Sequence, residues 1–139
     1  MVAGICSLTV RAFVGYLKRA AVGVLAALLL GLGVVGACDT VWAFSRGRPL
    51  ATLWGAESLS QVLLASAPYL ALAAGGVVAR RPWFVGLALT CSFWGFYLVE
   101  ITRPYEGGGA NIGLGILMLY SPIPIFVGSV IAALTLRRR

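Results

Sequence analysis

Apolar residues gather in four long runs, which short polar segments separate from one another. The runs cover residues 20–44, 59–79, 83–101 and 112–136. Because a helix rises about 1.5 Å per residue, roughly 20 apolar residues are enough to cross the hydrocarbon core of a bilayer. The pattern therefore predicts an all-α fold: a polytopic integral membrane protein whose four transmembrane helices form a compact bundle over residues 20–136.

The N-terminal residues 1–19 differ from these runs because cations interrupt their apolar positions. The apolar positions roughly follow one helical stripe, and Lys18 and Arg19 close the segment. This pattern predicts a basic amphipathic helix that lies on the membrane surface, although a tail without fixed structure has a similar composition. Residues 137–139 are all arginine and form a second basic segment at the other end of the chain.

Small residues recur at every fourth position on two of the runs, and this spacing places them on one face of a helix. Such ridges let two helix backbones approach closely, because no bulky side chain stands between them. We therefore expect the ridge of the first run to pack on the ridge of the second. The residues are Gly23, Ala27 and Gly31 on the first run and Ala67, Ala71 and Gly75 on the second.

Prolines interrupt the second and fourth runs. Pro68 lies inside the second run, and Pro122 and Pro124 lie near the middle of the fourth. Proline lacks the N–H that the helix ladder needs and its ring clashes with the preceding turn, so we expect kinks at these positions. Ser121 directly precedes Pro122, and its hydroxyl could satisfy a backbone group that the proline leaves free.

The composition supports membrane insertion of the whole chain. Of the 139 residues, 60% are hydrophobic, and the mean hydropathy is +0.97. A soluble domain of this size has too much surface for its volume to bury so many apolar side chains. The chain has no histidine, which removes the commonest general base and the usual haem or zinc ligand. We therefore expect neither a cofactor nor a metal.

The cysteines, Cys6, Cys38 and Cys91, are widely spaced and form no C-x-x-C pair. Their odd number does not predict a disulfide framework, so we expect them to act as small apolar side chains. One alternative concerns Cys38, because residues 35–38 loosely resemble the cleavage site of a lipoprotein. The apolar run continues beyond Cys38, which favours an uncleaved membrane span.

Charged residues divide unevenly between the two ends of the predicted bundle, and the net charge is +7. One end has three arginines and all 4 acids, which leaves eight of the 11 lysines and arginines at the other end. By the positive-inside rule, both termini are predicted to be cytoplasmic, in a bacterial inner membrane. The excess positive charge then faces anionic lipid head groups, and no nucleic-acid partner is needed to explain it. The cations of the basic end are Arg11, Lys18, Arg19, Arg80, Arg81, Arg137, Arg138 and Arg139.

The acids at the predicted outer end suggest a polar site, because a carboxylate at the end of an apolar span is costly unless it is paired or hydrated. Glu100 and Arg103 lie three positions apart and could pair on one helical face. The same residues could instead form an ion-pair network that only orders the loops. The candidate residues of this outer face are Asp39, Glu57, Glu100, Arg103, Glu106 and Asn111.

A run of glycines, Gly107, Gly108 and Gly109, precedes the fourth apolar run. The free N–H groups at the start of the following helix could bind an anion there. The run lacks the lysine and the glycine spacing of a phosphate-binding loop, and a flexible turn explains it as well.

Two functions of different classes fit these residues, and we favour the first. An accessory or binding subunit of a larger membrane assembly would have paired outer acids and an exposed groove of small residues. A small homo-oligomeric transporter or channel for an ion or small solute would instead have a hydrated path. That path would run from the outer acids past Tyr120 toward Ser66 and Ser92.

A membrane enzyme that acts on a lipid-linked substrate is a third class. It would need Glu100 and Glu106 to converge with Asn111 in one cleft at the outer surface. No nucleophile, metal cluster or second catalytic signature accompanies these acids in the sequence. The pattern therefore argues against an enzyme.

Overall fold

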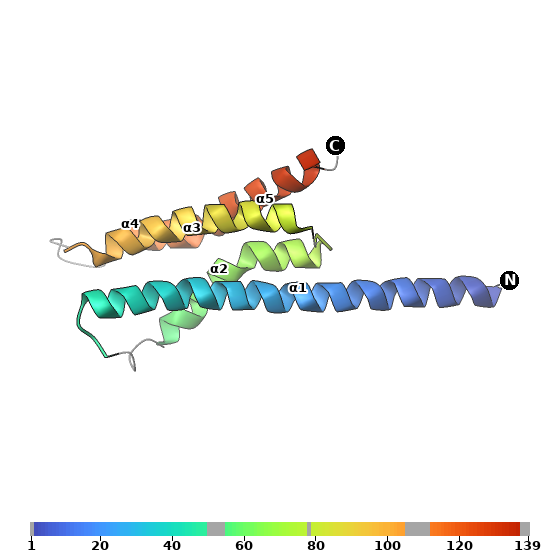
Figure 1. Ribbon diagram of the computed structural model, residues 1–139, viewed down its shortest axis with the longest axis horizontal. Helices are drawn as coiled ribbons and strands as arrows, with labels where there is room; N and C mark the ends of the chain where they lie inside the picture. Colours follow the sequence, from blue (N-terminus) through green and yellow to red (C-terminus); the bar gives the residue numbers. More distant parts are fainter. Residues whose placement is uncertain (1, 50–54, 78, 105–111, 137–139) are drawn as a thin grey trace.

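The computed structural model describes residues 2–49, 55–77, 79–104 and 112–136, with side chains from residue 13 onward except those of Ala56 and Leu136. Within these ranges the regular secondary structure is entirely helical, in agreement with the predicted fold class. In Figure 1, α1 and α2 lie beside each other, and α3, α4 and α5 form a second group above them. The helices are α1 (Val2–Ser45), α2 (Ala56–Ala74), α3 (Arg80–Thr102), α4 (Ile112–Tyr120) and α5 (Pro122–Leu136).

Three helical segments of the described chain are long and apolar enough to cross a membrane. They are Phe13–Ser45 within α1, the whole of α3, and Ile112–Thr135, which joins α4 to α5. Large apolar side chains cover their outward faces; Phe84 of α3, for example, is 65% exposed. A continuous apolar surface of this kind suits lipid and not water. The chain is therefore a small multi-pass integral membrane protein.

Helix α1 runs without a break through the boundary predicted near residue 19. Its 44 residues extend over about 66 Å at 1.5 Å per residue, roughly twice the thickness of a hydrocarbon core. Tyr16, which belongs to the predicted surface segment, packs on the bundle and donates a hydrogen bond to the Ala74 carbonyl oxygen (2.6 Å). Helix α1 is therefore continuous over Val2–Ser45, and its N-terminal part extends beyond the other helices (Figure 1).

The C-terminal ends of α1 and α2 have the same geometry. Gly47 and Gly76 adopt positive φ angles of 62° and 70°, which glycine reaches without steric cost. The N–H of the next residue then donates to a carbonyl oxygen five residues earlier. Arg48 donates to the Ala43 oxygen (2.9 Å), and Val77 donates to the Leu72 oxygen (2.9 Å). This is the Schellman motif, and it ends both helices sharply.

The turn between α2 and α3 lies earlier in the chain than predicted. α2 ends at Ala74, and α3 begins at Arg80 with Ala79 as its N-cap. The predicted apolar runs end at residue 79 and begin again at residue 83, which placed the turn at residues 80–82. Here Pro82 occupies the first turn of α3, where no intrahelical N–H is required of it. Arg80 and Arg81 consequently project from the first turn of a helix.

The break between α4 and α5 occurs at Ser121, directly before Pro122. Pro122 has no N–H to donate to the carbonyl oxygen of Met118, four residues earlier. The hydroxyl of Ser121 donates to that oxygen instead, at 2.9 Å. The predicted role of Ser121 is confirmed. By contrast, α2 continues through Pro68 as one helix.

The contact between α1 and α2 uses the predicted face of α1 but a different face of α2. Gly23 lies against Ala73, and a Cβ atom on Gly31 would collide with Ser66 Oγ and with the Val62 carbonyl oxygen. On α2, Ala71 and Gly75 are exposed to the surroundings, although both belong to the expected ridge. Helix α2 therefore presents Val62, Ser66 and Ala73 to α1. This face differs from the predicted ridge by a rotation about the axis of α2.

Candidate functional site

Asp39 and Ser58 form the central contact at the acidic end of the bundle. Asp39 lies near the C-terminus of α1, and Ser58 lies in the first turn of α2. The Ser58 hydroxyl donates to Asp39 Oδ2 (3.3 Å), and the Gly55 N–H donates to Ser58 Oγ (3.3 Å). The Asp39 carboxylate is thus held by the start of a neighbouring helix, where exposed N–H groups favour negative charge.

Glu100 and Arg103 form the predicted ion pair at the end of α3. Arg103 Nη1 lies 2.7 Å from Glu100 Oε1, and the two side chains are 64% and 26% exposed. Arg46 Nη2 donates to the Arg103 carbonyl oxygen (3.5 Å), which connects the end of α1 to the end of α3. Exposed pairs of this kind contribute about 0.2–1 kcal/mol. The ion pair lies within the end of α3, and only the Arg46 hydrogen bond joins it to the end of α1.

The remaining acidic-end residues do not complete a single site. The Arg48 guanidinium lies over the Trp42 ring, 5.5 Å from its centroid. Glu57 is exposed in the first turn of α2. Asp39 and Glu100 share no hydrogen bond or ion pair among the described residues. The structure therefore provides two separate contacts here, Asp39–Ser58 and Glu100–Arg103, rather than one cluster of acids.

Several residues of the predicted outer face lie outside the part of the chain that the structure describes. These are Glu106, Asn111 and the candidate anion-binding glycines Gly107, Gly108 and Gly109. The convergence of Glu100 with Glu106 and Asn111 stays a prediction for this reason. Within the described ranges, no three cysteine or acidic side chains gather closely enough to hold a metal ion.

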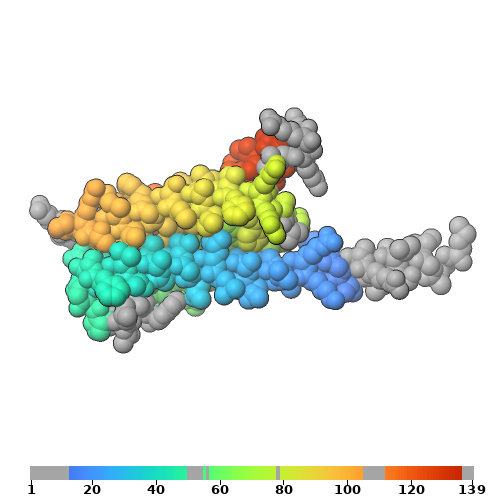
Figure 2. Space-filling model, in the orientation of Figure 1, coloured from blue at the N-terminus to red at the C-terminus, as the bar shows by residue number. Residues whose placement is uncertain are grey.

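The middle of the bundle is closed by hydroxyl groups that bond to protein atoms. Tyr69 of α2 and Thr90 of α3 share a hydrogen bond of 2.6 Å, and both side chains are fully buried. Ser66 and Ser129 are also fully buried, and each donates to a carbonyl oxygen one turn earlier in its own helix. The helical back-bond satisfies a hydroxyl without water or ligand. Figure 2 shows α1 and α3 in direct contact along one face.

The proposed hydrated path would have to join residues that the structure places on different surfaces. Ser66 is fully buried in the α1–α2 contact. Ser92 is exposed on the outside of α3 and donates to the Ala88 carbonyl oxygen (2.9 Å). Tyr120 is exposed at the end of α4. These three side chains do not line a common space within one copy of the protein.

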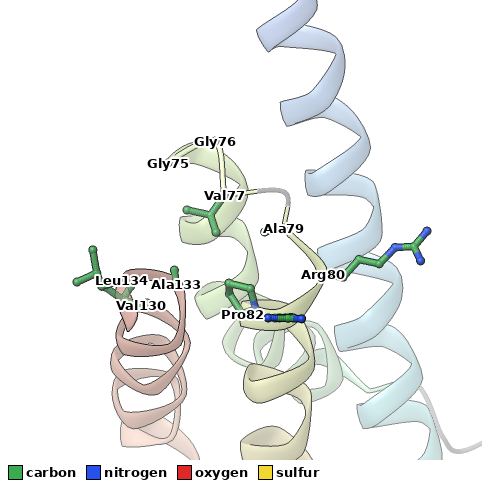
Figure 3. A pocket seen from close by; sticks show the side chains of 10 residues that line it. Gly75, Gly76, Val77, Ala79, Arg80, Pro82, Val130, Ala133 and Leu134 are labelled. Atoms are coloured by element: carbon green, nitrogen blue, oxygen red, sulfur yellow. The ribbon is translucent and has the colours of Figure 1, made fainter. Parts of the chain in front are cut away.

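A hollow lies at the opposite, basic end of the bundle. It is a cavity of about 660 Å³ between the end of α2, the start of α3 and the last turns of α5 (Figure 3). Its wall includes Val77, Pro82, Val130 and Leu134, which are apolar, and Arg80 and Arg81, which are cationic. In the sequence these two arginines indicate only the topology, and their pattern predicts no site.

The cavity exists because small residues meet where α5 leans away from α3. Figure 1 shows the C-terminal end of α5 directed away from the rest of the bundle. Gly75, Gly76 and Ala133 line the opening and occupy little of it. Trp83 Nε1 donates to the Val77 carbonyl oxygen (2.8 Å), which fixes the turn against α3. The glycine pair before Arg80 was the only sequence signal, and a pair of glycines alone does not indicate a cavity.

The two ends therefore offer different chemistry: paired polar groups at one, and a cationic, apolar-walled cavity at the other. Comparison with protein-family models, with curated proteins and with solved structures finds no match to this chain. Its function has to be inferred from its own residues.

Proposed function

We propose that this chain is an accessory or binding subunit of a membrane assembly in a bacterial inner membrane. Four helical segments cross the bilayer in this proposal: α1, α2, α3 and the joined α4–α5, with both termini cytoplasmic. The N-terminal part of α1, the C-terminal end of α5 and the connection between α2 and α3 lie at one end of the bundle in Figure 1. Arg80 and Arg81 begin α3, and Lys18 and Arg19 follow Tyr16, which bonds to Ala74 at the end of α2. An excess of cations on one side is the usual mark of the cytoplasmic face.

Helix α2 is not among the three segments that are long and apolar enough to cross a membrane by composition, yet its surroundings suit a crossing helix. Its 19 residues extend over about 28 Å, close to the thickness of the hydrocarbon core. Tyr69, Leu72 and Ser66 are buried by neighbouring helices, and Pro68 is fully buried as well. A helix enclosed by protein on several sides meets less lipid, so it tolerates more polar side chains.

The closed interior is the observation that carries the choice of a binding subunit. A transporter needs at least one polar group that solvent reaches in the middle of the membrane. Here Tyr69 and Thr90 bond to each other, and Ser66 and Ser129 bond within their own helices. Because these four hydroxyls already have protein partners, they offer no free polar group to a solute, and the lipid-facing surface is the better candidate for recognition.

The outer face of α3 is a part of that surface that suits contact with another helix. Ala88, Ser92 and Gly95 are exposed and follow one another at helical spacing. A Cβ atom added to Gly95 would meet no other atom within 4 Å, so this stretch of backbone is open to a neighbour. Small residues on a lipid-facing helix permit close approach of a second helix, because packing rather than hydrophobicity drives association in lipid.

A substitution at Gly95 tests the binding function. The tagged full-length chain would be cross-linked in native membranes, and proteins recovered in fixed stoichiometry would be quantified. Gly95→Leu is expected to reduce the stoichiometric partner about tenfold, because the new side chain holds the partner helix away. Gly33→Leu is the matched control, since Gly33 of α1 is also exposed and also has no neighbour within 4 Å.

The control variant should leave the partner within about twofold of the unsubstituted chain. Equal recovery with both variants would contradict a contact through α3. Recovery of the chain alone, combined with ion or solute flux through reconstituted vesicles, would instead support the homo-oligomeric transporter.

A further inference from the structure

We propose that the cavity at the basic end binds one anionic phospholipid, with its phosphate at Arg80 and Arg81 and its acyl chains along α5. This inference rests on the membrane topology proposed above, but not on the contact face of α3. The lipid would be an integral part of the bundle on the cytoplasmic side.

The size and lining of the cavity define the chemistry of its occupant. A volume of about 660 Å³ falls in the usual range for small-molecule sites, roughly 300–1,000 Å³. Val77, Val130 and Leu134 have apolar side chains, whereas the lining residues Arg80 and Arg81 are cationic. The matching ligand is apolar over most of its length and anionic at one end, which is the chemistry of an anionic lipid.

The two arginines are available to an external anion. Both side chains are exposed, and neither forms an ion pair with another described residue. The described acids all belong to the other end of the bundle, where Asp39 and Glu100 have partners of their own. An arginine guanidinium presents a planar fork of donors that fits two oxygens of one phosphate, so a pair of arginines is well suited to a phosphodiester.

The guanidinium groups of the two arginines can reach the cavity by rotation of their side chains. Figure 3 shows the Arg80 side chain directed away from Val130, Ala133 and Leu134, although Arg80 is among the residues that line the cavity. Exposed side chains exchange rotamers within nanoseconds, so the guanidinium can turn toward a phosphate. Ala79, the N-cap of α3, makes no side-chain capping bond, and the start of the helix adds positive potential beside the arginines.

Continuity with lipid-facing surface favours a phospholipid over a soluble anion. Leu134 lines the cavity, and Leu134 and Ile131 are both exposed on α5, at 58% and 55%. An acyl chain that begins in the cavity can therefore continue along α5 into the bilayer without crossing a polar surface. A zwitterionic lipid would bring its own cation toward the arginines, which favours lipids with net negative charge.

Native mass spectrometry of the full-length protein tests this site. The protein would be released from bilayers of phosphatidylcholine containing phosphatidylglycerol, and bound lipid would be counted per chain. One phosphatidylglycerol is expected to stay bound, and the double variant Arg80→Gln/Arg81→Gln should weaken its retention about tenfold. Ala133→Phe should weaken it as well, because the larger side chain fills the cavity without changing any charge.

The matched control is Lys18→Gln/Arg19→Gln, which removes two cations of the same end that do not line the cavity. If this control lost phosphatidylglycerol to the same extent, general surface charge would explain the retention, and the proposed site would be overturned. Retention unchanged in both cavity variants would overturn it too. Displacement of the lipid by millimolar inorganic phosphate would show that the acyl chains are not recognised. None of these results depends on the partner measured with Gly95→Leu, so the two proposals can fail separately.

Discussion

At the scale of single residues, glycine decides how closely α1 approaches α2. Gly31 lies so near α2 that a Cβ atom would be 2.7 Å from the Val62 carbonyl oxygen, and nearer still to Ser66 Oγ. Gly33, two positions later, faces away and has no neighbour within 4 Å. The sequence identified Gly31 correctly as a contact residue, because its spacing from Gly23 and Ala27 follows one helical face.

Alanine substitutions at these two glycines should have opposite effects on stability. Gly31→Ala is expected to lower the free energy of unfolding by about 1–3 kcal/mol, since backbone and Ser66 must shift to admit the methyl group. Gly33→Ala should raise it by up to about 1 kcal/mol, because alanine favours the helix and meets nothing. Unfolding of the purified protein by SDS in mixed micelles measures both. Equal destabilisation by the two variants would contradict the α1–α2 contact described here.

At the scale of elements, the sequence located the interruptions better than it located the helix ends. Ser121 bonds to the carbonyl oxygen that Pro122 leaves free, as the adjacent residues indicated. The start of α3 was missed because Pro82 has two roles, as a helix breaker and as a residue of the first helical turn. Which role applies depends on where α2 stops, and Gly76 decides that through its positive φ angle.

A double-mutant cycle tests the interaction between Ser121 and the break. Ser121→Ala is expected to lower the free energy of unfolding by about 1 kcal/mol, because the Met118 carbonyl oxygen loses its donor in a buried position. In the background of Pro122→Ala, the restored N–H can bond to that oxygen, so the same change should cost close to nothing. The measurement is again unfolding in SDS. An equal cost in both backgrounds would show that Ser121 acts through some other contact.

At the scale of the whole molecule, topology follows from where the charges stand relative to the helix ends. Glu57 lies in the first turn of α2 and Arg103 caps the C-terminus of α3, at the end with the acids. Arg81 lies in the first turn of α3, and Lys18 follows Tyr16, which bonds to the end of α2, so both lie at the opposite end. These four residues are exposed, so cysteines in their place would be open to a reagent in the adjoining solution. Glu57 and Arg81 flank α2, and their sides decide whether α2 crosses the membrane.

Single cysteines at these positions, with Cys6, Cys38 and Cys91 replaced, give a direct measurement. A membrane-impermeant maleimide added to spheroplasts should label positions 57 and 103 and leave positions 18 and 81 unmodified. In inverted vesicles the order should reverse, as both termini are expected in the cytoplasm. Labelling of positions 57 and 81 from one side would mean that α2 does not cross, and a fully reversed pattern would mean that the orientation is opposite.

The sequence by itself determined the membrane class, the helical fold and the division of charge between the two ends. These properties depend on composition along short stretches, because the transfer of a helix into lipid depends mainly on which side chains it contains. The pair of Glu100 and Arg103 belongs to the same group, since a spacing of three residues brings two side chains together on any helix. No long-range information was needed for these predictions.

Only the tertiary structure decided which faces meet and where space remains. In water, an apolar stripe identifies the buried face of a helix, but a helix in lipid is apolar on all sides, and the stripe carries little information. For this reason the sequence predicted that Ala71 would face α1. In the structure Ser66 and Ala73 make that contact instead. The cavity beside Arg81 depends on how α5 leans away from α3, which is a relation between elements distant in sequence and leaves no mark on either one alone.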